Sequence, residues 1–160
     1  MAFGGSSSPT PYTCLAITVA IMIGSVCHAV ASEVNTGYFG NVAIKGYDPV
    51  AYFTESRAIK GSTEYSLEWL GATWQFTGPE HRDLFAANPI SYAPQYGGYC
   101  SGGLAYGDRT TNIDPEAWRI IDGKLYLNYD QGTAAELEQP GQLEKIEANW
   151  PQVRAQLPAQ

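Results

Sequence analysis

The sequence predicts a small α+β domain in which short antiparallel β-hairpins pack with helices. Three observations support this class. Two stretches, "TEYSLEWLGATWQF" and "AWRIIDGKLYLNY", each show strand-like alternation on both sides of a turn. A stretch near the C-terminus places apolar residues at helical spacing. The 17 glycines and 10 prolines cluster at turns, and a length of 160 residues suits one domain.

The domain is expected to open with a short strand and a turn. Val42 and Ile44 alternate as strand residues do, and Gly46 then ends the pattern. Asp48, followed by a proline, marks a turn.

The first hairpin is predicted over residues 63–76. Tyr65, Leu67 and Trp69 alternate with polar residues, and Gly71 helps to make the turn. On the return strand Trp74 and the phenylalanine two residues later alternate in the same way.

A helix is expected to follow this hairpin. Thr77 and Glu80 have the spacing of a capping box, with a proline in the first turn. Leu84 and Phe85 are expected to face inward. The helix should end before Pro89, because the residue that precedes a proline resists helical angles.

The second hairpin is predicted after a short turn that starts at Asp114. Asp122 and Gly123 are the residue types that a two-residue type I′ turn favours. A C-terminal helix completes the domain, and Pro151 is expected to kink it or to divide it in two. The helix is predicted from the helical spacing of Leu143, Ile146, Trp150, Val153 and Leu157.

Residues 1–31 have the pattern of an export signal. An apolar run extends from Cys14 to Val30, and the small residues Ala29 and Ala31 form a signal-peptidase pattern before Ser32. The usual positive region is absent, because residues 1–31 contain no lysine or arginine, so an uncleaved membrane tether remains the alternative. We therefore expect a signal peptide over 1–31 and an exported domain over 32–160, in the periplasm or outside the cell, without stable membrane insertion of the mature domain.

Charge and cysteine content limit the functions of this domain. The formal net charge of −7 argues against nucleic-acid binding. Residues 32–160 keep one cysteine, Cys100, and one histidine, His81, so neither an internal disulfide nor a CxxC redox pair can form. No nucleophile-elbow pattern precedes a serine, and the glycines around Cys100 lack the lysine and Ser/Thr of a phosphate loop.

Several long motifs resemble those of the YHS-domain proteins, in the exported form that bacteria commonly carry. They are "GYDPVAYF", "GATWQF", "HRDLFAANPISYAPQYGGYC", "DGKLYLNY" and "EANWP", and they run from Asn41 to Pro151. The resemblance implies a hairpin-and-helix core related to TRASH-type metal-binding modules, here with a C-terminal helical extension. Some relatives are thought to bind metal, and some are described as selenoproteins. The cysteines of the metal-binding relatives are absent from "GYDPVAYF" and "QFTG", so their metal site cannot be transferred to this chain.

Cys100 is the leading candidate site residue. A helical turn in "YCSGGLAYG" would place its sulfur near backbone amides at a helix start, which favours the reactive thiolate. Gly97 and Gly98 would allow a tight turn or the close approach of a ligand. The alternative is a buried cysteine that only packs.

His81 and Asp48 are the other candidate ligands. His81 could also act as a base for Cys100, and Asp48 could instead be a partner for Tyr47. Each has a structural alternative: His81 can pack and make one hydrogen bond, and Asp48 can stabilise its turn. The expected metal is copper or zinc. Cu(I) could bind to Cys100 and His81 alone, whereas a structural zinc site normally needs four ligands and the chain lacks a closed Cys/His set. The tyrosines expected to line a pocket, with core packing as the alternative, are Tyr47, Tyr92, Tyr96, Tyr99 and Tyr106.

These observations lead to three functional hypotheses. The first is a non-enzymatic exported domain that binds a metal ion or small ligand with Cys100 as its anchor. The second is a thiol-dependent redox protein, in which oxidised Cys100 is reset by a partner protein. The third keeps Cys100 structural and makes the domain an interaction module.

Overall fold

The computed structural model describes Met1 and residues 33–38 and 40–157. The expected export signal and its cleavage site therefore lie, apart from Met1, outside the described residues. None of the helices in the described part of the chain is long and apolar enough to span a membrane.

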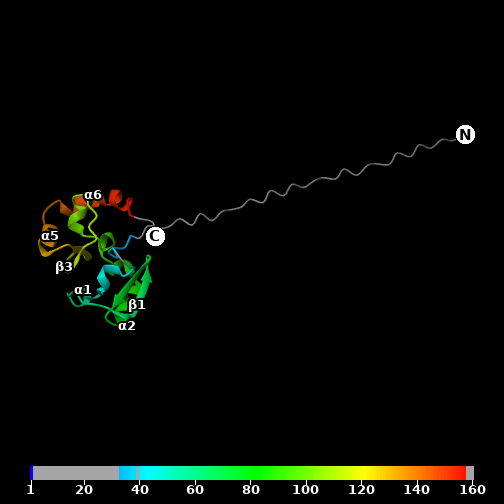
Figure 1. Cartoon of the computed structure of the whole chain (residues 1–160), viewed down its shortest axis with the longest axis horizontal. Coiled ribbons are helices and arrows are strands. Elements are labelled where there is room, and N and C mark those ends of the chain that lie inside the picture. The colour runs from blue at the N-terminus through cyan, green and yellow to red at the C-terminus, as the bar shows by residue number, and fades with distance from the viewer. Residues whose placement is uncertain (2–32, 39, 158–160) are drawn as a thin grey trace.

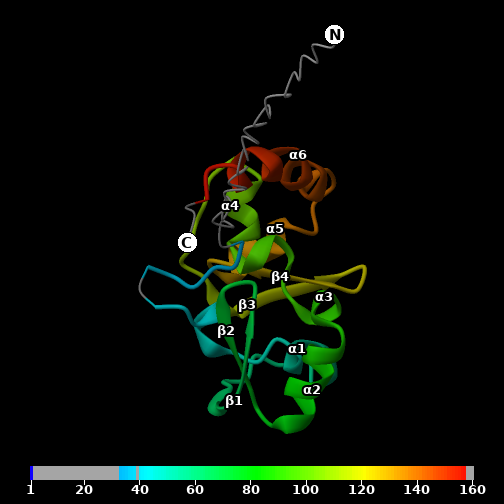
Figure 2. The same cartoon turned by 90° about the vertical axis from the view of Figure 1, so that its right-hand side faces the viewer.

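The fold is α+β, with two separate two-stranded antiparallel sheets, β1–β2 and β3–β4. Figure 1 shows the elements in chain order, and Figure 2 shows α6 at one end of the molecule and β1 and α2 at the other, with β3 and β4 between them. The elements are η1 (Ala43–Gly46), α1 (Ala51–Thr54), β1 (Ser62–Trp69), β2 (Ala72–Phe76), α2 (Pro79–Ala87), α3 (Pro89–Tyr92), η2 (Gln95–Gly98), α4 (Ser101–Leu104), β3 (Asp114–Ile121), β4 (Lys124–Asn128), α5 (Gln131–Glu136) and α6 (Gln142–Arg154), where η marks a 3₁₀ turn.

Both predicted hairpins are confirmed, together with their turns. In the first, Trp69 pairs with Ala72 across a two-residue turn. In the second, Ile121 pairs with Lys124. All four turn residues have positive φ, as a type I′ turn requires; they are Leu70 (50°), Gly71 (71°), Asp122 (50°) and Gly123 (72°). The turn predicted to start at Asp114 is wrong, because Asp114 already pairs with Asn128 in β3.

The predicted strand over Val42 and Ile44 is wrong. Ile44 and Lys45 adopt left-handed angles, with φ of 41° and 56°, and this reverses the chain in η1 instead of extending it. The backbone N–H of Ile44 donates to the carbonyl of Asn35, and Val42 makes only an isolated bridge with Thr73. Apolar alternation over so few residues did not distinguish a strand from a buried turn.

Helix α2 begins one residue later than the capping-box pattern predicted. Gly78 occupies the N-cap, and the Thr77 hydroxyl donates to the Asp48 carboxylate instead of capping the helix. Phe85 is fully buried, as predicted. Leu84 is 38% exposed, so its expected inward orientation is wrong.

Helix α6 runs through Pro151 as one element, so the predicted division does not occur. Pro151 lacks the N–H that would bond the carbonyl four residues earlier, at Glu147. Packing offsets this loss, because Ile146 and Val153 are buried on either side of the proline. The side chain of Glu147 is also held, since it accepts a hydrogen bond of 2.8 Å from the Tyr96 hydroxyl.

The hydrophobic core has two parts, and β4 contributes to both. Leu125 and Leu127 belong to the cluster that includes Trp74 and Phe85 of the first hairpin and α2. Tyr126, between them in the chain, belongs to the second cluster, with residues of α4 and α6. Successive strand residues point to opposite faces, so the second hairpin separates the two clusters.

Candidate functional site

Cys100 lies directly before α4, after the tight turn of η2. Tyr96, Gly97 and Gly98 all have positive φ and together reverse the chain. The Cys100 N–H then donates to the Thr110 carbonyl at 3.0 Å, which fixes the residue at the N-cap of α4. Cys100 is only 2% exposed and packs within the first core cluster. The helical turn expected after it is present.

Cys100 nevertheless lines a groove with a volume of about 340 Å³. The backbone N–H of Tyr129 donates to the Cys100 Sγ at 3.2 Å. We call this depression the thiol groove. Its lining residues are Cys100, Gly102, Gly103, Tyr106, Thr110, Tyr129, Thr133 and Glu136.

The candidate tyrosines are not gathered around Cys100. Tyr106 lines the thiol groove and is 74% exposed, as expected of a residue at its mouth. Tyr96 is buried in the second core cluster, where it contacts the rings of Tyr126 and Trp150.

The remaining candidate tyrosines also lie elsewhere. Tyr99 is 5% exposed, and burial raises the pKa of its hydroxyl, with Arg109 acting in the opposite direction. Tyr47 packs against the first core cluster below the ammonium of Lys60, and Tyr92 contacts Phe53 edge-to-face. Among the described residues, the structure adds one tyrosine to the thiol groove, Tyr129.

Asp48 and His81 form a second constellation, centred on a fully buried carboxylate. The Oδ1 atom of Asp48 accepts the backbone N–H groups of Val50 at 2.9 Å and Ala51 at 3.3 Å, at the start of α1. Its Oδ2 atom accepts both the N–H and the hydroxyl of Thr77, each at 2.8 Å. The same oxygen lies 2.7 Å from Nδ1 of His81.

This arrangement determines the orientation of the imidazole. A carboxylate only accepts hydrogen bonds, so Nδ1 of His81 carries a proton and donates it to Asp48. The other ring nitrogen, Nε2, lies 3.4 Å from the Thr54 hydroxyl and 3.9 Å from a Glu55 carboxylate oxygen. Thr54 also donates to the Val50 carbonyl at 3.1 Å, which holds its hydroxyl beside the imidazole ring.

The structure thus joins Asp48 to His81 but places Cys100 in different surroundings. Within the described residues, Cys100 and His81 share no hydrogen-bond partner, and His81 is not among the residues that line the thiol groove. In the same part of the chain, no group of three or more histidine, cysteine, aspartate or glutamate side chains is arranged to hold a metal ion.

Sequence reasoning missed the partners that complete each constellation. Thr77 carried a visible signal, but its spacing indicated a helix cap rather than a carboxylate partner. The backbone amide of Tyr129 carried no sequence signal, because almost any residue type can supply a backbone N–H. Comparison of the chain with protein-family models, with curated proteins and with solved structures gave no match.

Proposed function

We propose that this chain is an exported, non-enzymatic binding domain of the YHS type, which holds a small ligand in the thiol groove against Cys100. The export pattern of residues 1–31 supports the exported localisation, and the YHS-like motifs support the family. The observation that carries the proposal is the position of Cys100, which is only 2% exposed yet lines a groove of about 340 Å³.

The groove lining indicates which ligands would fit. Thr110 and Thr133 supply hydroxyls, Tyr106 an aromatic ring, and Glu136 a carboxylate to the same lining as the thiol. Glu136 is the only other carboxylate, histidine or cysteine among the described lining residues, so a copper or zinc ion would have to bring ligands of its own. A small organic molecule with donors for these oxygens and an apolar part is therefore the favoured occupant.

The test measures the reactivity of Cys100 in the native full-length protein, purified from the exporting cell. Iodoacetamide labelling is followed by peptide mapping, which separates Cys100 from Cys14 and Cys27 if these remain. Mass spectrometry of the native protein and elemental analysis for copper and zinc are done on the same sample. We expect Cys100 to be labelled without denaturant, and a co-purified molecule to reduce the labelling rate.

Cys100→Ser is the matched variant, because a serine keeps the size and the acceptor for the Tyr129 N–H. It should fold normally and lose the co-purified molecule. Labelling of Cys100 only after unfolding would contradict the proposal and favour a purely structural cysteine. Stoichiometric copper or zinc that is lost in Cys100→Ser would replace the organic ligand by a metal ion.

A thiol-redox role is the second candidate, favoured by the amide hydrogen bond to the sulfur. In that reaction the thiolate attacks one oxygen of hydrogen peroxide, the O–O bond breaks, hydroxide leaves, and Cys100 becomes a sulfenic acid. A partner thiol would have to reduce it, since Cys100 is the one cysteine of residues 32–160. Dimedone trapping at Cys100 after stoichiometric peroxide supports this role, and its absence removes it.

A further inference from the structure

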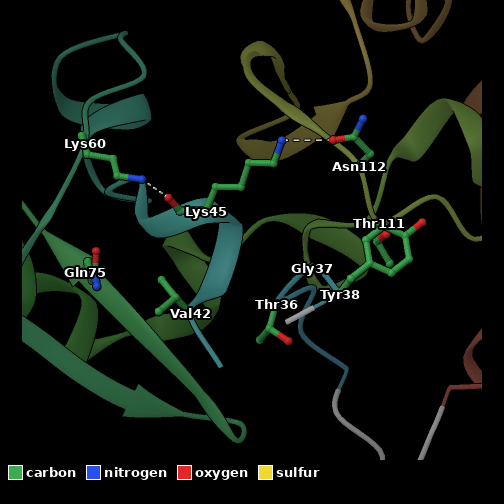
Figure 3. A pocket seen from close by; sticks show the side chains of 9 residues that line it. All are labelled: Thr36, Gly37, Tyr38, Val42, Lys45, Lys60, Gln75, Thr111 and Asn112. Atoms are coloured by element: carbon green, nitrogen blue, oxygen red, sulfur yellow. Dashed lines mark hydrogen bonds between the residues drawn. The ribbon is translucent and has the colours of Figure 1, made fainter. Parts of the chain in front are cut away.

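A second groove, remote in the chain from Cys100, has a different chemical character. It has a volume of about 530 Å³ and lies between the N-terminal segment, η1, β2 and the loop before β3 (Figure 3). We call it the lysine groove. Its lining residues are Thr36, Gly37, Tyr38, Val42, Lys45, Lys60, Gln75, Thr111 and Asn112.

The two lysines are held on this groove by neutral acceptors. The Nζ of Lys45 donates to the Ile113 carbonyl at 2.6 Å and to Oδ1 of Asn112 at 3.1 Å. The Nζ of Lys60 donates to the backbone carbonyl of Lys45 and lies 5.0 Å from the ring centroid of Tyr47. Figure 3 shows the Lys60 ammonium at the backbone oxygen of Lys45, and the Lys45 side chain extending to Asn112.

Neither ammonium makes an ion pair with a carboxylate in the described part of the chain, where the ion pairs involve His81, Arg82, Arg119 and Arg154. The groove-lining residues that the structure describes include no aspartate or glutamate either. What distinguishes Lys45 and Lys60 from the other lysines is that both line one groove. Two positive charges therefore face one groove without local neutralisation, although the chain as a whole is acidic.

The backbone around the lysines is fixed. Lys45 and Gly46 both have positive φ, so the turn that presents Lys45 has a defined shape. A Cβ atom added at Gly46 would lie 2.5 Å from Oε1 of Gln75, which shows how closely β2 packs behind this turn. Gln75 itself is only 9% exposed. The groove wall is thus formed before any ligand arrives, which reduces the entropy lost on binding.

The other lining side chains distinguish between kinds of anion. Val42 and Tyr38 supply apolar and aromatic surface, and Gln75 and Asn112 supply amides. Among the described lining residues the charge recognition rests on two lysine ammoniums, and the apolar surface beside them favours an anion that carries a carbon body. From this combination we infer that the lysine groove binds a small organic carboxylate, with its charge at Lys45 and Lys60 and its apolar body against Val42.

The first test is an NMR titration of the wild-type protein with sodium benzoate. Benzyl alcohol, which keeps the ring without the charge, and inorganic phosphate, which keeps charge without a ring, are the comparison probes. We expect benzoate to shift the signals of Val42, Gln75 and Asn112 saturably, and each comparison probe to bind more weakly. Shifts confined to other regions, or equal binding of benzyl alcohol, would overturn the inference.

The second test removes the charges. Lys45→Gln and Lys60→Gln together should weaken benzoate binding by about tenfold, since each exposed ammonium–carboxylate pair contributes modestly. Lys124→Gln, on the tip of the second hairpin, makes the same chemical change away from the groove and should leave binding unchanged. If the double variant folds poorly, Lys60→Gln alone is compared with Lys60→Arg, which should retain binding. Equal affinity in Lys60→Gln and the wild type would contradict the inference.

This inference does not depend on the proposed function. Cys100 does not line the lysine groove, so Cys100→Ser should bind benzoate with unchanged affinity. Loss of benzoate binding in Cys100→Ser, with folding intact, would assign the carboxylate to the thiol groove instead.

Discussion

At the scale of single residues, Asp48 is the most highly connected side chain of the two candidate constellations. Its carboxylate accepts five hydrogen bonds, from Val50, Ala51, His81 and twice from Thr77. These donors belong to the start of α1, the end of β2 and α2, so one buried charge joins three parts of the chain. The buried charge is tolerated because its hydrogen-bonding capacity is filled.

Asp48→Asn tests this structural role. The NH₂ group of the asparagine would replace one of the two carboxylate oxygens. It would then face the donors of Thr77 or those at the start of α1, and these buried donors would lose their acceptor. We expect a loss of roughly 2–4 kcal/mol in the free energy of unfolding, measured by urea denaturation. Asp83→Asn, at an exposed ion pair with Arg82, is the control and should change stability by less than about 0.5 kcal/mol. A neutral effect at Asp48 would show that the carboxylate is dispensable for folding.

At the scale of elements, the two hairpin turns share a geometry but differ in their sequences. Asp122 and Gly123 are residues that accept left-handed angles readily. In the first hairpin the corresponding position is Leu70, with φ of 50° and 48% of its surface exposed. Left-handed angles cost an ordinary L-residue about 1–2 kcal/mol, so the first turn is strained where the second is not.

Leu70→Asn should therefore stabilise the protein by about 0.5–1 kcal/mol, because asparagine tolerates left-handed angles. The measurement is the urea midpoint at constant m-value. Asp122→Asn is the matched control in the second hairpin and should be neutral. Destabilisation by Leu70→Asn would mean that the contact of Leu70 with the neighbouring apolar surface outweighs the relief of backbone strain.

At the scale of the whole molecule, buried tyrosines connect stability to alkaline pH. Burial raises the pKa of the Tyr52, Tyr96, Tyr99 and Tyr126 hydroxyls above the ordinary tyrosine value. Tyr52 and Tyr96 also donate hydrogen bonds, to the Pro115 carbonyl and to Glu147, which only the protonated hydroxyl can make. The folded state therefore retains protons that the unfolded chain releases.

Stability should be unaffected by these groups below pH about 10, the ordinary tyrosine pKa, and should fall as the pH rises above it. The measurement is urea unfolding between pH 8 and 11, with tyrosinate absorbance recorded in parallel. Tyr52→Phe should be less stable at pH 8 but should lose less stability on going to pH 11. Ionisation of the buried tyrosines before unfolding, with no loss of stability, would contradict this account.

Much of the architecture follows from local sequence. The two hairpins were predicted correctly because alternation and turn chemistry lie within about a dozen consecutive residues. The α+β class and the helix after the first hairpin follow from the same kind of local pattern. The errors fall where long-range contacts compete with local preference: Ile44 enters a left-handed turn, Thr77 turns to Asp48, and Pro151 stays inside α6.

The sequence by itself determined that Cys100 and His81, the one cysteine and the one histidine of residues 32–160, were the residues to examine, together with Asp48 in its Asp-Pro turn. Only the tertiary structure decided that Asp48 holds His81, 33 positions away, while the Cys100 sulfur meets the amide of Tyr129. It alone also brought Lys45 and Lys60 to one groove. Hydrogen bonds and charge pairs form between whichever groups the packed core brings together, and no local periodicity encodes that proximity.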